Sequence, residues 1–152
     1  MEENNKVLAI LKEYLDKEFV NNPSRYGAWL KGILKEVEEG KLAAEFVVRK
    51  EMTNGIGTLH GGVIAGILDE MMGATVVSLG AKYFYTTVNL NVDYFYPARE
   101  NEVITAKAFM VKKGTMIHHV QCELWNMAAN KLLAKATSNL LKIDVEVKHD
   151  AK

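Results

Sequence analysis

Residues 54–70, NGIGTLHGGVIAGILDE, join a glycine-rich loop to an apolar segment that contains two adjacent acids. The apolar segment extends from His60 to Leu79, and its composition predicts a helix that is buried on nearly every side. A carboxylate in the middle of such a helix is costly unless it is paired or faces a cleft. Asp69 and Glu70 are therefore the first candidates for chemistry.

The two acids cannot share one role equally, because adjacent helical residues point about 100° apart. We expect one of them to be functional and the other structural. Buried carboxylates have raised pKa values and cluster at functional sites. The alternative for either acid is a salt bridge to a lysine of a neighbouring sheet, or a place on an exposed edge of the helix.

His60, Gly61 and Gly62 open the predicted helix. A helix N-terminus carries unpaired N–H groups and about half a positive charge, and the glycines allow a ligand to approach the backbone. Such a place suits an oxygen that becomes negative during reaction, as a thioester carbonyl oxygen does. The alternative is that Gly61 and Gly62 only permit tight packing at the start of the helix.

Gly61 and Asp69 are eight residues apart, which is about 12 Å along a helix. Side chains lean toward the helix N-terminus and recover only part of that distance. One carbonyl group can hardly touch both residues of a single chain. If they act together, the site combines two chains.

Flanking patterns predict the remaining elements. Residues 5–20 have the three-to-four spacing of an amphipathic helix, and residues 29–37 and 41–50 predict a hairpin. Four further segments have the patterns of strands: 84–96, 101–112, 115–126 and 131–143. In the first of them, Val88, Leu90 and Val92 alternate with polar residues that are expected to face solvent. We therefore expect one α+β domain over residues 1–152. Its core, about 29–143, is a six-stranded antiparallel sheet wrapped around a long buried helix, with an extra N-terminal helix.

Composition narrows the function class. Lys plus Arg and Asp plus Glu both total 19, which argues against nucleic-acid binding by bulk charge. The single cysteine, Cys122, cannot form an intrachain disulfide, so we expect a reducing, cytoplasmic setting. The two acids and the glycines of 60–79 argue against a membrane span. His118 and His119 are neighbours on a strand and point to opposite faces, so we expect no metal site.

Two stretches resemble the hotdog-fold acyl-CoA thioesterases. The first carries Asn54, His60-Gly61-Gly62 and Leu68-Asp69, and the second is TTVNLNVDYFYPAREN at residues 86–101. The phenylacetate-degradation (PaaI-like) branch, to which mammalian thioesterase superfamily proteins also belong, is the most similar. The resemblance in organisation covers roughly residues 30–143.

The resemblance implies a role for each matching residue. Asn54 and the N–H of Gly61 would hold the thioester oxygen, while His60 would fix the loop and assist near the carbonyl. Asp69 of the neighbouring subunit would activate water or attack directly, and Thr87 would help to orient that water. Glu70 has no catalytic counterpart in the family pattern, so it is interpreted as structural.

The residues that would bind CoA depart from the family pattern at one turn. Many relatives have Gly-Arg after the turn at 113–114, where this chain has Gly114-Thr115. Arg99, Lys112 and Lys113 are the basic residues that would contact the CoA phosphates instead. The alternative is that they are ordinary solvated surface charges.

The resemblance implies an acyl-CoA thioesterase that forms a homodimer with shared sites, and a tetramer of two such dimers. Coenzyme A would enter as part of the substrate, and no other cofactor is expected. A non-catalytic acyl-CoA-binding hotdog protein is the main alternative, and a hotdog dehydratase is a weaker one. The presence of Asn54, Gly61 and Asp69 favours the enzyme, because a pure binder needs no base.

Overall fold

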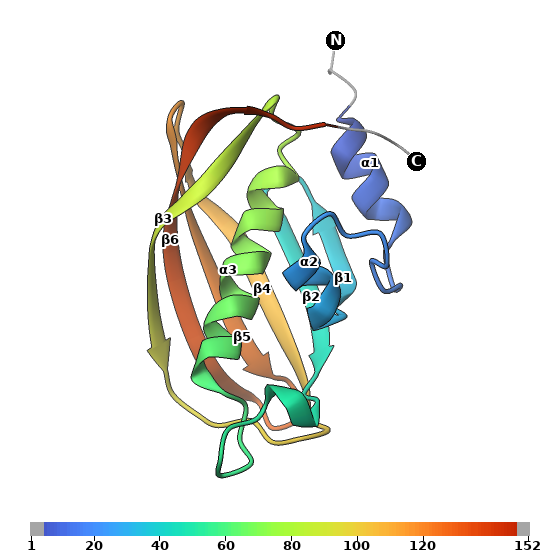
Figure 1. Cartoon of the computed structure of the whole chain (residues 1–152), viewed down its shortest axis with the longest axis vertical. Helices are drawn as coiled ribbons and strands as arrows, with labels where there is room; N and C mark the ends of the chain where they lie inside the picture. Colours follow the sequence, from blue (N-terminus) through green and yellow to red (C-terminus); the bar gives the residue numbers. More distant parts are fainter. Residues whose placement is uncertain (1–4, 149–152) are drawn as a thin grey trace.

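The computed structural model describes residues 5–148. Six antiparallel strands form one sheet in the spatial order β1-β2-β4-β5-β6-β3, and helix α3 lies across one face of it (Figure 1). The strands are β1 (Ile33–Glu38), β2 (Lys41–Val47), β3 (Tyr83–Tyr94), β4 (Val103–Lys113), β5 (Ile117–Asn126) and β6 (Lys131–Glu146). The helices are α1 (Lys6–Glu13), α2 (Arg25–Leu30) and α3 (Gly61–Val77), with a short 3₁₀ turn η1 (Lys50–Met52) before α3. The predicted fold class is confirmed.

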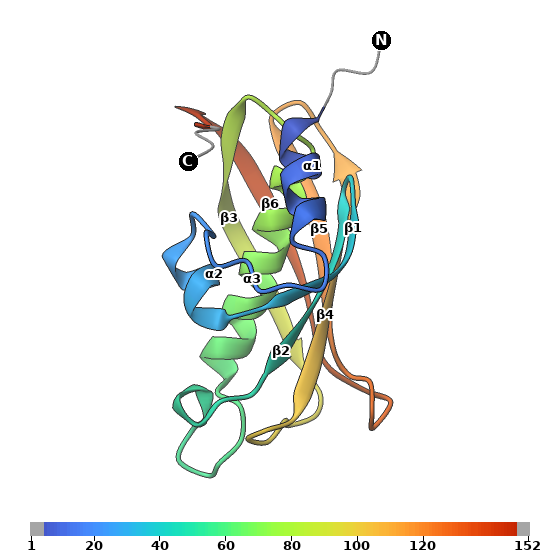
Figure 2. The same cartoon turned by 90° about the vertical axis from the view of Figure 1, so that its right-hand side faces the viewer.

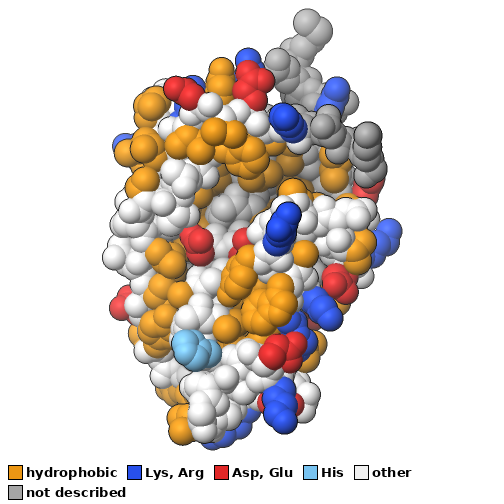
Figure 3. Space-filling view, viewed as in Figure 1, with side chains coloured by type: hydrophobic (Ala, Val, Ile, Leu, Met, Phe, Trp, Pro, Cys, Tyr) orange, Lys and Arg blue, Asp and Glu red, His pale blue; other side chains and the backbone are white. Residues whose placement is uncertain are grey.

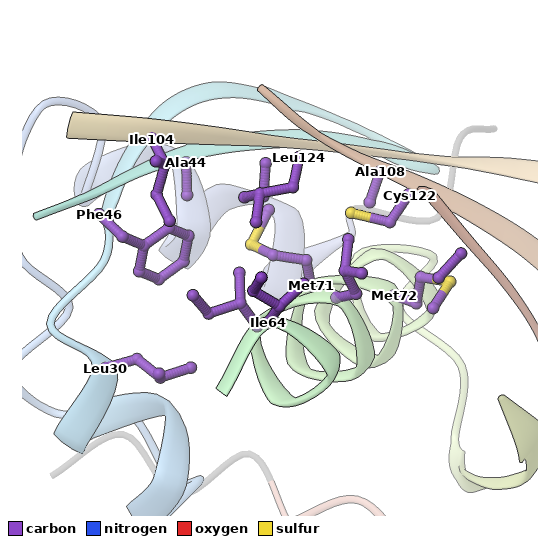
Figure 4. Close-up of a cluster of buried hydrophobic side chains, with 14 of the residues drawn as sticks. Leu30, Ala44, Phe46, Ile64, Met71, Met72, Ile104, Ala108, Cys122 and Leu124 are labelled. Atoms are coloured by element: carbon purple, nitrogen blue, oxygen red, sulfur yellow. The ribbon is translucent and has the colours of Figure 1, made fainter. Parts of the chain in front are cut away.

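The core lies between α3 and the sheet. Figure 4 shows Met71 and Met72 of α3 pointing toward Cys122 and Leu124 of β5. Small buried residues of β4, such as Ala108, leave room for the bulky helix side chains. Large groups from the helix thus fill the space above small groups of the sheet, as in other close-packed interiors.

The side of α3 that faces away from the sheet is only partly covered, so the prediction of a helix buried on nearly every side is wrong. Helix α2 lies beside the middle of α3 (Figures 1 and 2). Its Tyr26 packs so closely on Gly66 that a side chain at this glycine would collide with the tyrosine hydroxyl. Farther along the helix, Val77 is 37% exposed. Within residues 5–148 no helix, α3 included, combines the length and apolarity needed to cross a membrane.

The N-terminal helix is shorter than the predicted range of 5–20. It ends at Glu13, and Asp16 adopts a left-handed conformation with φ of 61°. The backbone N–H of Asp16 then donates to the carbonyl of Leu34 at 2.8 Å. The chain leaves the helix because these residues pair with β1 instead.

Helix α2 was not predicted, and it takes the first residues of the expected strand 29–37. Ser24 caps it by accepting a hydrogen bond from the N–H of Gly27 at 3.1 Å. Lys31 ends it in a left-handed conformation with φ of 55°, and β1 begins at Ile33. The expected hairpin is therefore confirmed from β1 onward, but it starts four residues late, and its second strand ends at Val47 and not at residue 50.

Candidate active site

The side chain of Asn54 holds the loop before α3 together. Its Oδ1 accepts hydrogen bonds from the N–H groups of Ile56 and Thr58, both at 3.1 Å. Its Nδ2 donates to Thr58 Oγ1 at 2.8 Å. An amide group has two N–H donors, so one remains for another acceptor. Asn54 thus has a loop-fixing role that the sequence did not reveal, and its contact with substrate stays a prediction.

His60 caps α3 with its imidazole ring. Its Nδ1 accepts a hydrogen bond from the N–H of Gly62 at 2.8 Å, so the neutral ring carries its proton on Nε2. A side chain at Gly62 would lie only 3.0 Å from this Nδ1. The loop-fixing role expected for His60 therefore has a structural basis. The N–H of Gly62 is already used, which makes it a poor donor to a substrate.

The N–H of Gly61 has no acceptor within residues 5–148. It is the first N–H of a helix, where the helix dipole adds partial positive charge. Gly61 is thus the better placed of the two glycines to stabilise an oxyanion.

Tyr94 fixes Gly61 from the other side, a role that sequence reasoning missed. Its hydroxyl donates to the Gly61 carbonyl oxygen at 2.9 Å, and its ring lies 3.5 Å from the place where a Gly61 Cβ would stand. The available signal was the alternation of β3, because Leu90, Val92 and Tyr94 share one face. Since β3 and α3 run in opposite directions, the end of β3 reaches the start of the helix.

Asp69 pairs with Thr87 of β3. The Thr87 hydroxyl donates to Asp69 Oδ1 at 2.8 Å. Within the described residues the other carboxylate oxygen has no hydrogen-bond partner. The two residues therefore meet within one chain, and the role of Thr87 in orienting water stays a prediction.

A β-bulge brings Thr87 to the helix side of the sheet. Thr87 pairs with Leu140 and Asn89 pairs with Asn139, so Val88 is an extra residue on β3. The strict alternation expected from the sequence would put Thr87 on the solvent-exposed face of the sheet together with Asn89. The bulge reverses the face between these two residues, and it leaves Val88 53% exposed. The prediction that Val88 faces the core with Leu90 is wrong for this reason.

The bulge is tied to β6 by two hydrogen bonds. The Asn89 side-chain oxygen accepts from the backbone N–H of Asn139 at 3.0 Å. The Asn89 carbonyl accepts from the buried Ser138 hydroxyl at 2.9 Å. These contacts hold the irregular backbone that orients Thr87.

Glu70 points to a different side of the helix and joins α3 to α2. Its Oε2 accepts a hydrogen bond from the Ser24 hydroxyl at 3.0 Å. Burial raises the pKa of Glu70, the Ser24 hydrogen bond opposes this, and the neighbouring charge of Asp69 adds to it. The two acids thus face different partners, as their spacing predicted.

The three basic residues expected to contact CoA lie at opposite ends of the sheet. Arg99 follows β3 and forms a backbone bridge with Thr58 of the loop before α3. Lys112 and Lys113 are the last two residues of β4, which begins at Val103. Ten residues of extended strand place Lys113 about 33 Å from Val103, which lies at the same end of the sheet as Arg99. One chain does not bring them together.

The histidines and the cysteine form no metal site in the described part of the chain. His118 is buried and stacks on Tyr85 at 4.1 Å between ring centroids, while His119 contacts Asn139 on the other face. Burial, and then the charge of Lys113, lower the pKa of His118. Burial raises the pKa of the Cys122 thiol, which keeps it from acting as a nucleophile.

Gly61 and Asp69 lie on one uninterrupted helix. The separation of about 12 Å inferred from the sequence therefore applies to the folded chain. We refer to Gly61 as the donor half of the candidate site, and to Asp69 with Thr87 as its acid half.

Comparison with known proteins places this arrangement in a family. A model described as Thioesterase superfamily matches residues 56–130. Human acyl-coenzyme A thioesterase 13 is 33% identical over 96 residues, which cover 63% of this chain and 69% of the relative. The crystal structure of zebra fish Thioesterase Superfamily Member 2 is 25% identical with a TM-score of 0.74, and the match covers 90% of this chain and 96% of the other.

The E. coli PaaI protein from the phenylacetic acid degradation operon has a TM-score of 0.80 at 16% identity, over 95% of this chain and 99% of PaaI. That likeness shows the fold alone. The family match includes Gly61, Asp69 and Thr87, while Asn54 lies just before it. The resemblance seen in the two sequence motifs is thus confirmed, and with it the hotdog arrangement of the sheet around α3. The chain belongs to the thioesterase superfamily and is a thioester hydrolase.

Proposed function

We propose that this chain hydrolyses acyl-CoA thioesters at a site shared by two copies of the chain. The observation that carries the proposal is the hydrogen bond from Thr87 to Asp69 Oδ1. It orients the carboxylate and leaves the second oxygen available beside the open side of α3.

In the proposed reaction a water attacks the thioester carbonyl carbon while Asp69 accepts a proton from it. The carbonyl oxygen becomes negative and accepts a hydrogen bond from the Gly61 N–H of the other copy. When the tetrahedral intermediate collapses, the carbon–sulfur bond breaks and the proton passes to the CoA sulfur. The products are a carboxylic acid and free CoA. Direct attack by Asp69, through an anhydride that water then hydrolyses, has the same overall balance.

The shared site requires a dimer, and β3 supplies an edge for it. In the described chain β3 pairs only with β6, so its other side is a free sheet edge next to Asp69 and Thr87. We propose that a second copy joins this edge around a two-fold axis, and that two such dimers form a tetramer. Twofold-related edge strands run antiparallel. The donor half of one copy would then approach the acid half of the other.

The same symmetry keeps all three basic residues as CoA-binding candidates. Lys112 and Lys113 lie at the end of the sheet far from their own Gly61. In an antiparallel dimer that end approaches the loop of the other copy, where Arg99 lies beside Thr58. We propose that these residues contact the CoA phosphates, which are the most negative part of the substrate.

The choice of acyl-CoA as substrate follows the human relative, which is named an acyl-coenzyme A thioesterase. Water and the acyl-CoA suffice for the proposed chemistry, so no further cofactor is proposed. The single cysteine of the sequence supports a reducing, cytoplasmic setting for the reaction.

Asp69→Asn tests the proposal. Loss of the base lowers kcat by at least about a hundredfold, measured as thiol release from a panel of acyl-CoAs. Glu70→Gln is the matched control, because the neighbouring acid contacts Ser24 and not Thr87. Activity of Asp69→Asn within a few-fold of wild type, or a larger loss in Glu70→Gln, contradicts the assignment. Tight acyl-CoA binding without turnover by the wild-type chain would favour the binding-protein alternative.

A further inference from the structure

A narrow apolar pocket lies at the C-terminal end of α3. Its volume is about 20 Å³, which is room for roughly one water-sized group. It is lined by side chains of α1, of α3, of β3 and of the segment after β6, among them Val7, Val76, Val77, Tyr83, Tyr85 and Val147. An apolar pocket of this size fits a methyl group better than a ring or a charged group.

Helix α1 is docked so that Val7 forms a fixed wall of this pocket. Asn5 caps α1 by accepting from the N–H of Leu8 at 3.0 Å, and its Nδ2 donates to the carbonyl of Ser78 at 2.8 Å. Ser78 directly follows α3, so one side chain joins the start of α1 to the end of α3. Leu11 anchors the other end of α1 by being buried in the core.

Open space beside α3 extends from the pocket toward the acid half of the proposed site. Asp69, Gly73 and Val77 are spaced four residues apart and so lie along one side of α3. A Cβ at Gly73 would meet no atom within 4 Å, which shows open space beside the helix between Asp69 and Val77. Figure 3 shows this face of the molecule hollowed below a band of hydrophobic side chains.

The opposite wall of this groove is β3, which runs antiparallel to α3. Thr87 contacts Asp69 at one end, while Tyr85 and Tyr83 line the pocket at the other. The distance from Asp69 to Val77 is about 12 Å along the helix, and that from Thr87 to Tyr83 is about 13 Å along the strand. An extended hydrocarbon chain advances about 1.3 Å per carbon–carbon bond because the bonds zigzag, so roughly ten carbon atoms cover this distance.

We propose that the acyl chain of the substrate lies between α3 and β3, with its terminal methyl group in this pocket. Val7 of α1 and Val147 then limit the length of the chain. The preferred substrates are unbranched aliphatic acyl-CoAs of roughly ten carbon atoms, by the distances above. This inference rests on the proposed acyl-CoA hydrolysis and adds a role for the N-terminal helix.

The test compares kcat/KM across straight-chain acyl-CoAs from butanoyl to octadecanoyl for the wild type and two Val7 variants. Val7→Phe fills the pocket and lowers the decanoyl-to-butanoyl ratio by about tenfold. Val7→Ala enlarges the pocket and moves the optimum to chains about two carbons longer. Leu8→Ala is the matched control, because Leu8 packs on the core next to Val7 but does not line the pocket.

The outcomes separate this inference from the proposed function. A wild type that hydrolyses acyl-CoAs while both Val7 variants keep its length profile overturns the pocket assignment alone. An equal shift in Leu8→Ala overturns it too, because loosening of α1 would then explain the change. No hydrolysis of any acyl-CoA by the wild type overturns both proposals.

Discussion

Removal of the Thr87 hydroxyl tests both the catalytic pair and the bulge that orients it. Thr87→Val keeps the shape of the side chain but deletes the donor to Asp69 Oδ1, which lies 2.8 Å away. A hydrogen bond to a charged group contributes about 1.5–3 kcal/mol. If that contribution is lost in the transition state, kcat falls by roughly ten- to a hundredfold.

The assay is steady-state thiol release from an acyl-CoA substrate, with Thr87→Ser and Thr86→Val as controls. Thr87→Ser retains the hydroxyl and is expected to keep most activity. Thr86 pairs with Leu141 and lies on the other face of β3, so Thr86→Val leaves kcat close to wild type. In a strand without the bulge, Thr86 would share the helix face with Leu90. A loss in Thr86→Val with normal activity in Thr87→Val would refute the reasoning.

Two further predictions concern Tyr94 and Glu70. Tyr94→Phe deletes the hydrogen bond to the Gly61 carbonyl. We expect steady-state kinetics to show kcat lowered by about tenfold and KM little changed. An unchanged kcat would show that Tyr94 has no part in the site. Burial raises the pKa of Glu70, so its protonated form stabilises the fold below the ordinary glutamate pKa and this stabilisation is lost as pH rises through the folded value. Glu70→Gln mimics the protonated acid. In denaturant titrations the unfolding free energy of this variant should exceed that of wild type at pH 8 and equal it at about pH 4. A difference in unfolding free energy that does not change with pH would contradict this account.

Much of the fold was predictable because apolar periodicity and turn residues agree over residues 60–143. The long apolar helix demands a sheet to cover it, and the strand patterns supply that sheet. Helix α2 was not predictable, because a six-residue helix has too short a pattern and depends on its contacts with α3. The length of α1 was overestimated because the pairing of Asp16 with Leu34 is a tertiary contact.

The candidate site was predicted as a set of residues whose catalytic roles stay predictions, but the geometry that joins them could not be inferred from the sequence. Asp69 was indicated by its place in an apolar helix, and Gly61 by its place at the start of that helix. Thr87 was indicated by the family resemblance. The bulge at Val88 was hidden, since the sequence there continues a regular alternation that the backbone does not follow. Tyr94 was missed because its role depends on where the end of β3 meets the start of α3.

The central claim is that each site combines Gly61 of one copy with Asp69 of another, and subunit mixing tests it most directly. Asn54→Ala disables the donor half, whether the amide meets substrate or only holds the loop, and Asp69→Asn disables the acid half. The two inactive proteins are unfolded, mixed and refolded together. Random pairing makes about half of the dimers mixed, and each mixed dimer has one site with both defects and one with neither.

The account predicts recovery of roughly a quarter of wild-type activity in this mixture. A mixture of Thr87→Val with Asp69→Asn is the matched control, because both changes lie in the same half-site and no intact site can form. We expect this control to show no more than the mean activity of its two components. Absence of recovery in the first mixture, with mixed dimers verified by mass, would contradict the shared site.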